Sequence, residues 1–166
     1  MEASTSPTTP IVSSPYKRIL VPHDGSEMSD RALNHALCVA KMANGELVIF
    51  HVMESDSIPP STLLAFIKPG AGLEEAREQV RTIFEGAVGR MFEERVQAAK
   101  ASGINAVSYK ISGGKPADTI VTESEEGEYD LIVMSSSRIA SSIRALGSTA
   151  RRVLDSTKKP VLLVHE

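Results

Sequence analysis

The stretch Tyr129–Arg152, YDLIVMSSSRIASSIRALGSTARR, decides how the rest of the chain is interpreted. Its apolar run Leu131–Met134 predicts a buried strand, a serine-rich loop over residues 135–142 follows, and Gly147 and Ser148 open a helix. The first N–H groups of a helix lack internal partners and the helix dipole favours negative charge there, so a strand, a small-residue loop and a helix N-terminus together attract anions. We expect this loop and the end of the chain's first strand to form a nucleotide-sized pocket.

Length and composition indicate one ordinary α/β domain. The 166 residues fit a single domain. Residues 1–15 are rich in Ser, Thr and Pro, which predicts a disordered tail, and we expect residues 16–166 to form the folded part. A net charge of -3 leaves no basic excess for neutralising phosphates, so nucleic acid is not the expected partner. No apolar run approaches the roughly 20 residues of a membrane span, so no membrane contact is expected and we predict a cytoplasmic protein.

The first half of the chain predicts a strand, a helix and a second strand. The first strand, Lys17–Val21, stops at Pro22, and Ser26 is placed to cap the helix that follows. Cys38 lies within that helix and is expected to pack inside the core; as a single cysteine it excludes an internal disulfide. The second strand, Glu46–Met53, is apolar on both faces in its middle, which is typical of a parallel sheet covered by helices.

The second half continues the alternation of helices and strands. We expect Ile83 and Phe84 to lie on the apolar stripe of its longest helix. Such alternation predicts a parallel sheet with right-handed crossovers, and ligands bind such sheets outside the carboxyl ends of the strands, where the strand order reverses. The predicted elements are a helical turn at Ser61–Ile67, helices at Leu73–Ala101, Pro116–Glu126 and Ser148–Thr157, and strands at Asn105–Ile111, Leu131–Met134 and Pro160–His165.

Several segments resemble the universal stress protein (UspA-like) family. They are YKRILVPHDGSEMSDRALNHAL from Tyr16, HV at the end of the second strand, IVMSSS, and LGSTARRVLDSTKKPVLLV near the C-terminus. The resemblance covers about Tyr16 to Glu166. It implies a five-stranded parallel open sheet in the order 3-2-1-4-5 with helices on both faces, an adenine nucleotide alpha-hydrolase-like fold. It also implies a homodimer in which the last strands, Val161–Val164, pair across the dimer axis.

One branch of that family binds ATP or a related adenine nucleotide through the pattern G-x-x-G-x9-G-[ST], whose glycines let the backbone approach ribose and phosphate. This chain keeps Gly147 and Ser148. Counting back from Gly147 puts Ser137 at the second glycine position, whereas counting forward from the strand puts Ser135 at the first. The two counts differ by one residue. Serine is small and can donate a hydrogen bond, but it does not tolerate positive φ as glycine does.

Other positions of the family's nucleotide pocket carry over from the resemblance. Asp24, just after Pro22, matches an aspartate near the adenosine, and Val52 matches a position whose backbone contacts adenine. Thr149 would meet the phosphates together with the two residues before it, and Arg138 could add a charge-assisted contact. The complete expected nucleotide site is Pro22, Asp24, Val52, Ser135, Ser136, Ser137, Arg138, Gly147, Ser148 and Thr149.

The histidines do not predict metal or catalytic chemistry. No spacing among the four histidines suggests a metal site, so Mg²⁺ or Mn²⁺ is expected only on the phosphates of a bound nucleotide. His23 adjoins Asp24, but adjacency in sequence does not make a catalytic dyad. We expect His51 to be a histidine with a hydrogen-bond partner at the strand end.

The favoured interpretation is a non-enzymatic stress-response module that binds ATP or AMP and dimerises. No G-x-x-x-x-G-K-[ST] motif and no obvious acidic pair for Mg²⁺ with a positioned base is present. Two alternatives stay open. The missing glycines favour a nucleotide-free UspA-type dimeric interaction module. The second alternative is an enzyme, such as a weak ATPase or an adenylating synthetase. The synthetase loop S-G-G-x-D-S is not present, and the segment HDGSE of this chain is only superficially similar to it.

Overall fold

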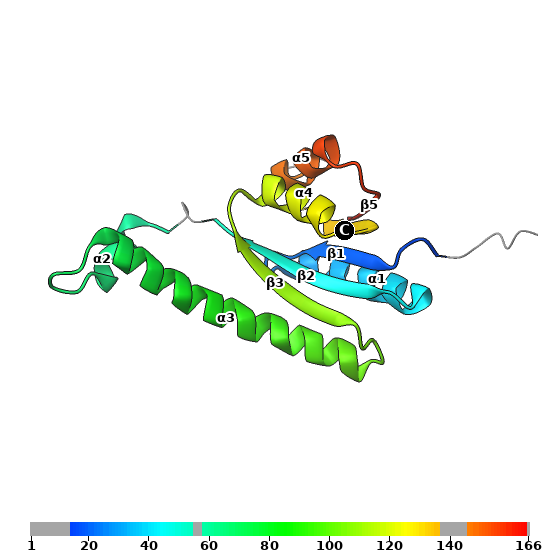
Figure 1. The fold of residues 1–166 in the computed structure, drawn as a ribbon, viewed down its shortest axis with the longest axis horizontal. Coiled ribbons are helices and arrows are strands. Elements are labelled where there is room, and N and C mark those ends of the chain that lie inside the picture. Colours follow the sequence, from blue (N-terminus) through cyan, green and yellow to red (C-terminus); the bar gives the residue numbers. More distant parts are fainter. Residues whose placement is uncertain (1–13, 55–57, 137–145, 166) are drawn as a thin grey trace, which may run out of the picture.

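A computed structural model describes residues 14–54, 58–136 and 146–165 of the chain. Five strands form one sheet in the order β3-β2-β1-β4-β5 (Figure 1), and every neighbouring pair is parallel. This arrangement confirms the fold class and strand order expected from the sequence. The strands are β1 (Arg18–Pro22), β2 (Glu46–Met53), β3 (Val107–Gly113), β4 (Leu131–Ser135) and β5 (Val161–Val164).

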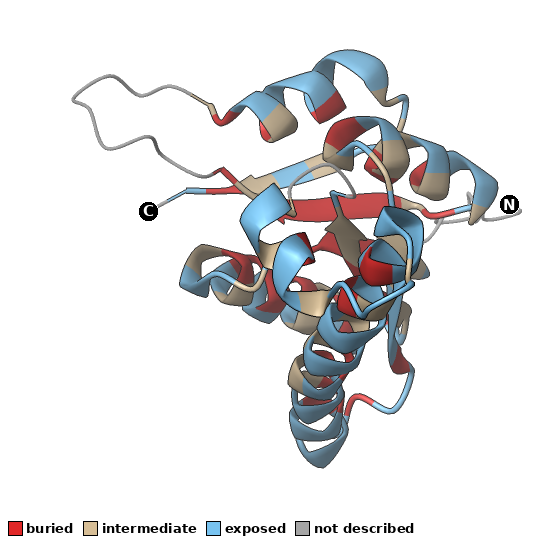
Figure 2. Ribbon diagram, turned by 90° about the vertical axis from the view of Figure 1, so that its left-hand side faces the viewer, coloured by how far each residue is buried: buried red, intermediate tan, exposed pale blue. Residues whose placement is uncertain are grey.

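Helices cover both faces of the sheet. One face packs against the first and third helices and the other against the last two, so two separate hydrophobic clusters form around the central strands. Figure 2 shows these central strands as the most completely buried part of the molecule. The helices are α1 (Glu27–Ala43), α2 (Pro60–Phe66), α3 (Leu73–Ala101), α4 (Pro116–Glu126) and α5 (Ser148–Ser156).

Local signals set most helix ends, as the sequence predicted. The side chain of Ser26 accepts a hydrogen bond from the backbone N–H of Ser29 and caps α1. Pro116 is the first residue of α4, where its missing N–H costs nothing. The third strand starts two residues later than predicted, because the chain is still leaving α3: the N–H of Ile104 bonds the carbonyl of Ala99.

Two expectations about packing were wrong. Cys38 is exposed, because the buried stripe of α1 runs through Ala36 and Ala40 and Cys38 points away from it. Ile83 and Phe84 are 55% and 48% exposed, because the first half of α3 extends beyond the sheet (Figure 1). Within the described part of the chain, no helix is both long and apolar enough to cross a membrane.

Candidate functional site

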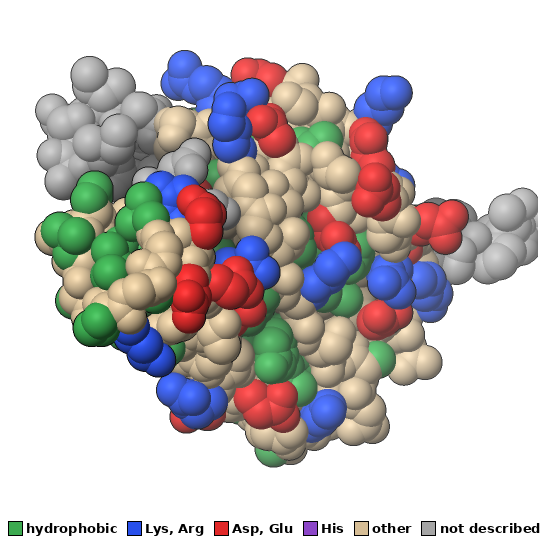
Figure 3. Space-filling model, turned by 60° about the vertical axis from the view of Figure 1, so that its left-hand side comes forward, with side chains coloured by type: hydrophobic (Ala, Val, Ile, Leu, Met, Phe, Trp, Pro, Cys, Tyr) green, Lys and Arg blue, Asp and Glu red, His purple; other side chains and the backbone are tan. Residues whose placement is uncertain are grey.

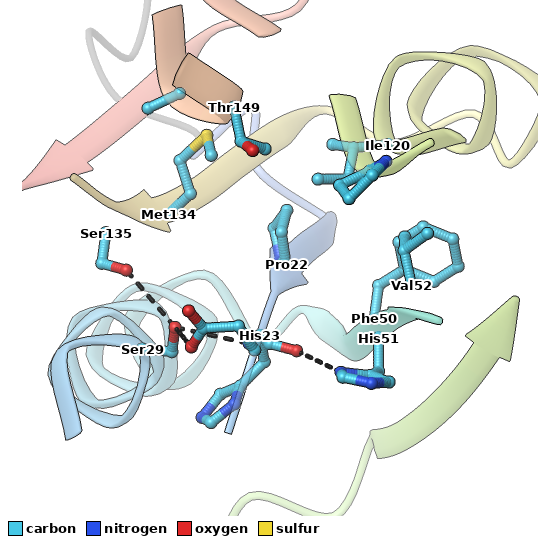
Figure 4. A pocket seen from close by; sticks show the side chains of 13 residues that line it. Pro22, His23, Ser29, Phe50, His51, Val52, Ile120, Met134, Ser135 and Thr149 are labelled. Carbon is cyan, nitrogen blue, oxygen red and sulfur yellow. Dashed lines mark hydrogen bonds between the residues drawn. The ribbon is translucent and has the colours of Figure 1, made fainter. Parts of the chain in front are cut away.

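A cavity of about 170 Å³, here called the inner chamber, lies at the carboxyl ends of β1, β2 and β4 (Figure 4). The neighbouring strands β1 and β4 lead into α1 and α5, which cover opposite faces of the sheet. The chamber therefore occupies the reversal of strand order where open α/β sheets bind ligands. Its walls include Pro22, Asp24, Ser29, Val52, Ser135 and Thr149.

A wider cleft of about 1000 Å³, the outer chamber, adjoins the inner one. Asp24, His51 and Val52 line both, and the far wall of the outer chamber is built by α2 and α3. Ligand pockets in proteins usually hold about 300–1,000 Å³, so a nucleotide-sized ligand would extend beyond the inner chamber. On the face seen in Figure 3, acidic and basic side chains are intermixed and no broad patch of one sign forms.

The carboxylate of Asp24 is fixed by the turn that starts α1. Its Oδ1 accepts hydrogen bonds from the backbone N–H of Ser26 at 2.9 Å and from the hydroxyl of Ser29 at 2.7 Å. The Ser29 hydroxyl also lies 3.3 Å from the hydroxyl of Ser135 (Figure 4). Burial by itself raises the pKa of Asp24, but the hydrogen bonds from Ser26 and Ser29 outweigh it and hold the pKa below its ordinary value. A charged, oriented carboxylate therefore lines the chamber.

His23 lies beneath Asp24 with both ring nitrogens bonded. Nδ1 accepts a hydrogen bond from the N–H of Gly25 at 3.0 Å, so Nε2 carries the proton and donates to Asp30 at 3.0 Å. Burial lowers the pKa of His23 more than the neighbouring Asp30 raises it. Arg95 of α3 holds Asp30 from the other side with bonds of 2.6 and 2.9 Å. The neutral ring thus uses its two nitrogens on Gly25 and Asp30, and His23 and Asp24 do not form a dyad.

The structure brings half of the predicted site together. Pro22, Asp24, Val52, Ser135 and Thr149 come from separate segments and line the same chamber. Pro22, Val52 and Ser135 lie at the ends of strands, Asp24 lies in the turn between β1 and α1, and Thr149 lies in the first turn of α5. Whether they hold a nucleotide stays a prediction.

The other predicted residues divide into three groups. Gly147 and Ser148 begin α5 beside Thr149 but do not line the chamber themselves. Ser137 and Arg138 lie outside the described residues. Ser136 does not line the chamber: its buried hydroxyl lies 2.8 Å from Nδ1 of His165, because successive residues of an extended chain point to opposite sides.

Some residues that line the inner chamber were not predicted from the sequence. Ser29 stands three residues after the helix cap Ser26, a spacing that puts both on one side of the first turn of α1. Pro116 and Ile120 come one helical turn apart on α4, so both face the chamber. The spacing was visible in the sequence, but the direction in which each helix crosses the sheet was not.

Comparisons with known proteins agree with this architecture. A family model described as the universal stress protein family matches residues 15–165. Universal stress protein YxiE of Bacillus subtilis is 31% identical over 152 residues, which cover 90% of this chain and 99% of YxiE.

Solved structures share the same fold. MJ0577 of Methanocaldococcus jannaschii superposes with a TM-score of 0.69 at 26% identity, covering 91% of this chain and 96% of its own. A universal stress protein in complex with cAMP gives a TM-score of 0.65 at 24% identity, with 90% and 97% of the two chains covered. The universal stress protein of Archaeoglobus fulgidus in complex with dAMP gives 0.60 at 23% identity, with 89% and 97% covered. Since the family model and YxiE both span nearly the whole chain, the chain belongs to the universal stress protein family.

Proposed function

We propose that this protein is a stress-response regulatory module that binds an adenine nucleotide, AMP or ATP, without turning it over. The observation that supports this most is the meeting of Asp24, Val52 and Thr149 in one chamber. These residues come from three distant parts of the chain, and together they offer a charged acceptor, an apolar wall and a helix N-terminus. The cytoplasmic location expected from the sequence stays a prediction.

Each part of a nucleotide has a matching wall. Val52 and Ile120 supply apolar surface for the base, and the Asp24 carboxylate supplies an acceptor for ribose hydroxyls. The phosphates lie at the start of α5, where Gly147 caps the helix and the first N–H groups have no helical partners. The complexes with cAMP and dAMP are of other proteins with this fold, and they make adenine nucleotides the first ligands to test.

The chemistry of the chamber favours binding over turnover. Among the described lining residues of the inner chamber there is no lysine or arginine, and its carboxylate, Asp24, already accepts bonds from Ser26 and Ser29. The outer chamber is lined by Arg77 and Arg81, and both are paired with glutamates of their own helix: Arg77 with Glu74, and Arg81 with Glu78 and Glu85. Phosphoryl transfer needs positioned cations and a residue that orients the nucleophile. The described residues also contain no cluster of three metal-binding side chains, so Mg²⁺ or Mn²⁺ would be held chiefly by the phosphates.

Isothermal titration with AMP and ATP tests the binding. We expect the wild-type protein to bind, and Asp24→Asn to weaken binding about tenfold, because a hydrogen bond to a charged acceptor is replaced by one to a neutral acceptor. Asp155→Asn changes an exposed carboxylate of α5 in the same way and should leave the affinity unchanged. No heat at millimolar nucleotide would overturn the proposal.

A phosphate-release assay tests the second half of the proposal. Incubation of the protein with ATP and a divalent cation should release phosphate no faster than the protein-free control. A sustained turnover that Asp24→Asn abolishes would assign the chamber to an enzyme instead.

A nucleotide-free interaction module is the second candidate, and one observation favours it. Ser136 is bonded to His165, so within the described residues the serine-rich loop offers the chamber only Ser135. Mass spectrometry of small molecules released from the freshly purified protein distinguishes the two. A nucleotide that copurifies in proportion to the protein removes this candidate.

We also propose that the protein is a homodimer. Strand β5 pairs with β4 along one side and forms the edge of the sheet along the other. Leu162 in the middle of β5 is 38% exposed, and an exposed apolar edge strand is suited to pairing with a second chain.

A further inference from the structure

Two hydrogen bonds of the same kind hold the turn that carries Asp24. The backbone N–H of Gly25 donates to Nδ1 of His23 at 3.0 Å, and the backbone N–H of Ser26 donates to Oδ1 of Asp24 at 2.9 Å. In each bond a side chain accepts from the N–H two residues further along, which is the arrangement of an Asx-turn. Because the two turns overlap, the position of the Asp24 carboxylate depends on the first bond as well as on its own.

The bond from Gly25 depends on where the proton of the His23 ring lies. Nδ1 can accept only while the proton of the neutral ring is on Nε2. The other neutral tautomer and the imidazolium both place a proton on Nδ1, so that two donors face each other and the turn must open. The side chain of His23 is 0% exposed, so solvent does not compete for either nitrogen.

Asp30, in the first turn of α1, sets this tautomer. Its Oδ1 lies 3.0 Å from Nε2 of His23, and an ionised carboxylate can only accept, so the proton must lie on Nε2. Arg95 donates to both oxygens of Asp30 at 2.6 and 2.9 Å, and these bonds are the main reason why the pKa of Asp30 lies below its ordinary value. Asp30 is therefore charged, and only an acceptor, at neutral pH.

We infer that Asp30 is a positioning residue of the nucleotide site, which acts through His23 and the N–H of Gly25 to keep Asp24 in its binding orientation. This assignment rests on the proposed function. Asp30 lines neither the inner nor the outer chamber, so its effect on a ligand there has to pass through His23. A carboxylate that bonds the second nitrogen of a metal-binding histidine fixes the tautomer and orientation of that ring in the same way.

Asp30→Asn tests the assignment by titration calorimetry with AMP at pH 7.5. The amide has the shape of the carboxylate, but it can donate as well as accept, so it no longer selects the tautomer of His23. Only molecules with the proton on Nε2 keep the turn closed, and the apparent dissociation constant rises by the inverse of their fraction. We expect AMP affinity to fall about fivefold.

The same substitution in a His23→Asn background separates positioning from support of the fold. The asparagine of that background can accept from the N–H of Gly25 in an ordinary Asx-turn, without a ring whose tautomer must be set. Asp30→Asn should then change AMP affinity by less than about twofold, because the path through the histidine no longer exists. An equal loss in both backgrounds would mean that Asp30 acts without His23, and would overturn the inference.

Two control variants match the other losses that accompany Asp30→Asn. Glu27→Gln removes another carboxylate from the first turn of α1, at a side chain that is 86% exposed. Arg95→Met removes both bonds from α3 to Asp30 but leaves Asp30 to accept from His23. Both should keep AMP affinity within about twofold of the wild-type value. A loss in Arg95→Met equal to that in Asp30→Asn would assign the effect to the ion pair and contradict the role of His23.

A measurement on the wild-type protein covers the case in which the variants do not fold. Protonated His23 cannot accept from Gly25, so bound AMP should favour the neutral ring and lower its pKa. A bound anion that acts by its charge alone would raise that pKa. The charged and titratable groups around His23 are Asp24 and Asp30 at the start of α1, Arg95 of α3, and His51 of β2, which bonds its backbone carbonyl.

An NMR titration of the His23 ring with and without saturating AMP reads this difference. A lower pKa in the complex supports the inference, and a raised or unchanged pKa contradicts it. If the wild-type protein and Asp30→Asn bind AMP equally, the positioning role is overturned while nucleotide binding stands. If the wild-type protein does not bind AMP, the proposed function fails and takes the inference with it.

Discussion

His23 is the side chain on which the contacts beneath the inner chamber converge. Its backbone N–H donates to the carbonyl of Phe50 at 2.8 Å, and its own carbonyl accepts from His51. Its ring bonds both Gly25 and Asp30 and meets the ring of Phe92 edge-on at 5.2 Å. One residue thereby joins the ends of β1 and β2 to the first turn of α1.

Acidification should destabilise the fold through His23. Burial holds the pKa of the folded ring below the ordinary value of about 6.5, to which it returns on unfolding. Above that pH, His23 is neutral in both the folded and the unfolded protein, and the free energy of unfolding keeps its full value. Below it the unfolded state binds the proton first, so the free energy of unfolding falls as the pH decreases toward the folded pKa. Urea denaturation at pH 7.5 and 5.5 measures the drop.

The variant His23→Gln is the control for this effect. Glutamine cannot take up a proton in this range, so its free energy of unfolding should change less between the two pH values than that of the wild-type protein. The variant His35→Gln, at an exposed position, should show the same decrease in the free energy of unfolding between pH 7.5 and 5.5 as the wild-type protein. Asp24 and Asp30, whose pKa values are also lowered, lose their contributions only at lower pH. An identical pH dependence in His23→Gln would contradict the prediction.

A pair of serine variants separates ligand binding from helix capping. Ser29→Ala removes the hydroxyl that donates to Asp24 and contacts Ser135, and should weaken AMP binding severalfold. Ser26→Ala removes the cap of α1 and should lower the free energy of unfolding by about 1 kcal/mol. It leaves the backbone N–H that bonds Asp24, so affinity should change less. Calorimetry and urea denaturation of both variants check this, and the reverse ranking of affinities would refute it.

Helix α3 contains two glycines that differ in their surroundings. At Gly89 an added Cβ would lie 3.3 Å from the hydroxyl oxygen of Tyr109, so this glycine allows close packing of α3 on β3. At Gly86 the nearest atom would be 3.8 Å away, on the flexible side chain of Arg90. The tight neighbour that would justify a glycine in mid-helix therefore exists at Gly89 only.

Alanine at these two positions should consequently have different effects. Gly86→Ala should raise the free energy of unfolding by about 1 kcal/mol, the usual advantage of alanine within a helix. Gly89→Ala should raise the free energy of unfolding by less than Gly86→Ala does, because the side chain of Tyr109 must move to make room for the added methyl group. Urea denaturation of the two variants checks the order, and equal or inverted gains would mean that the packing of Tyr109 imposes no constraint.

Elements with local markers could be predicted from the sequence. Ser26 and Pro116 fix helix starts through their own side chains, and the apolar run of β4 predicts its strand. The start of β3 was predicted two residues too early. The backbone N–H of Ile104 still bonds the carbonyl of Ala99, and this bond depends on how the end of α3 unwinds. Cys38 was misplaced because an apolar-looking helix position need not fall on the buried stripe.

The site was harder to predict than the fold because it depends on pairing between distant segments. Asp24 and Thr149 were predicted as site residues from the family resemblance, and the strand order brings both to the wall of one chamber. The orientation of Ser136 follows from the register of β4 against β5, which sets its hydroxyl beside His165. The inclusion of Ser29 depends on how α1 lies over the sheet, and residue spacing alone does not report that.

The assembly of the whole molecule can be tested at the edge strand β5. Leu162→Glu places a charge in the middle of that strand, and in a two-fold pair the two charges would come close together and repel. The wild-type protein should sediment as a dimer and the variant as a monomer. Leu154→Glu, at a 36% exposed leucine of α5, is the matched control and should stay dimeric. A monomeric wild-type protein, or a dimeric Leu162→Glu, would refute the proposed interface.

The inner chamber takes its walls from segments that are far apart in the sequence: Pro22 and Asp24 are translated well before Ser135 and Thr149. A nascent chain on the ribosome has no complete chamber until α5 has emerged and docked. A small molecule that occupies the chamber can therefore stabilise, by mass action, only chains that already contain α5, and it cannot rescue a fragment that ends before Thr149.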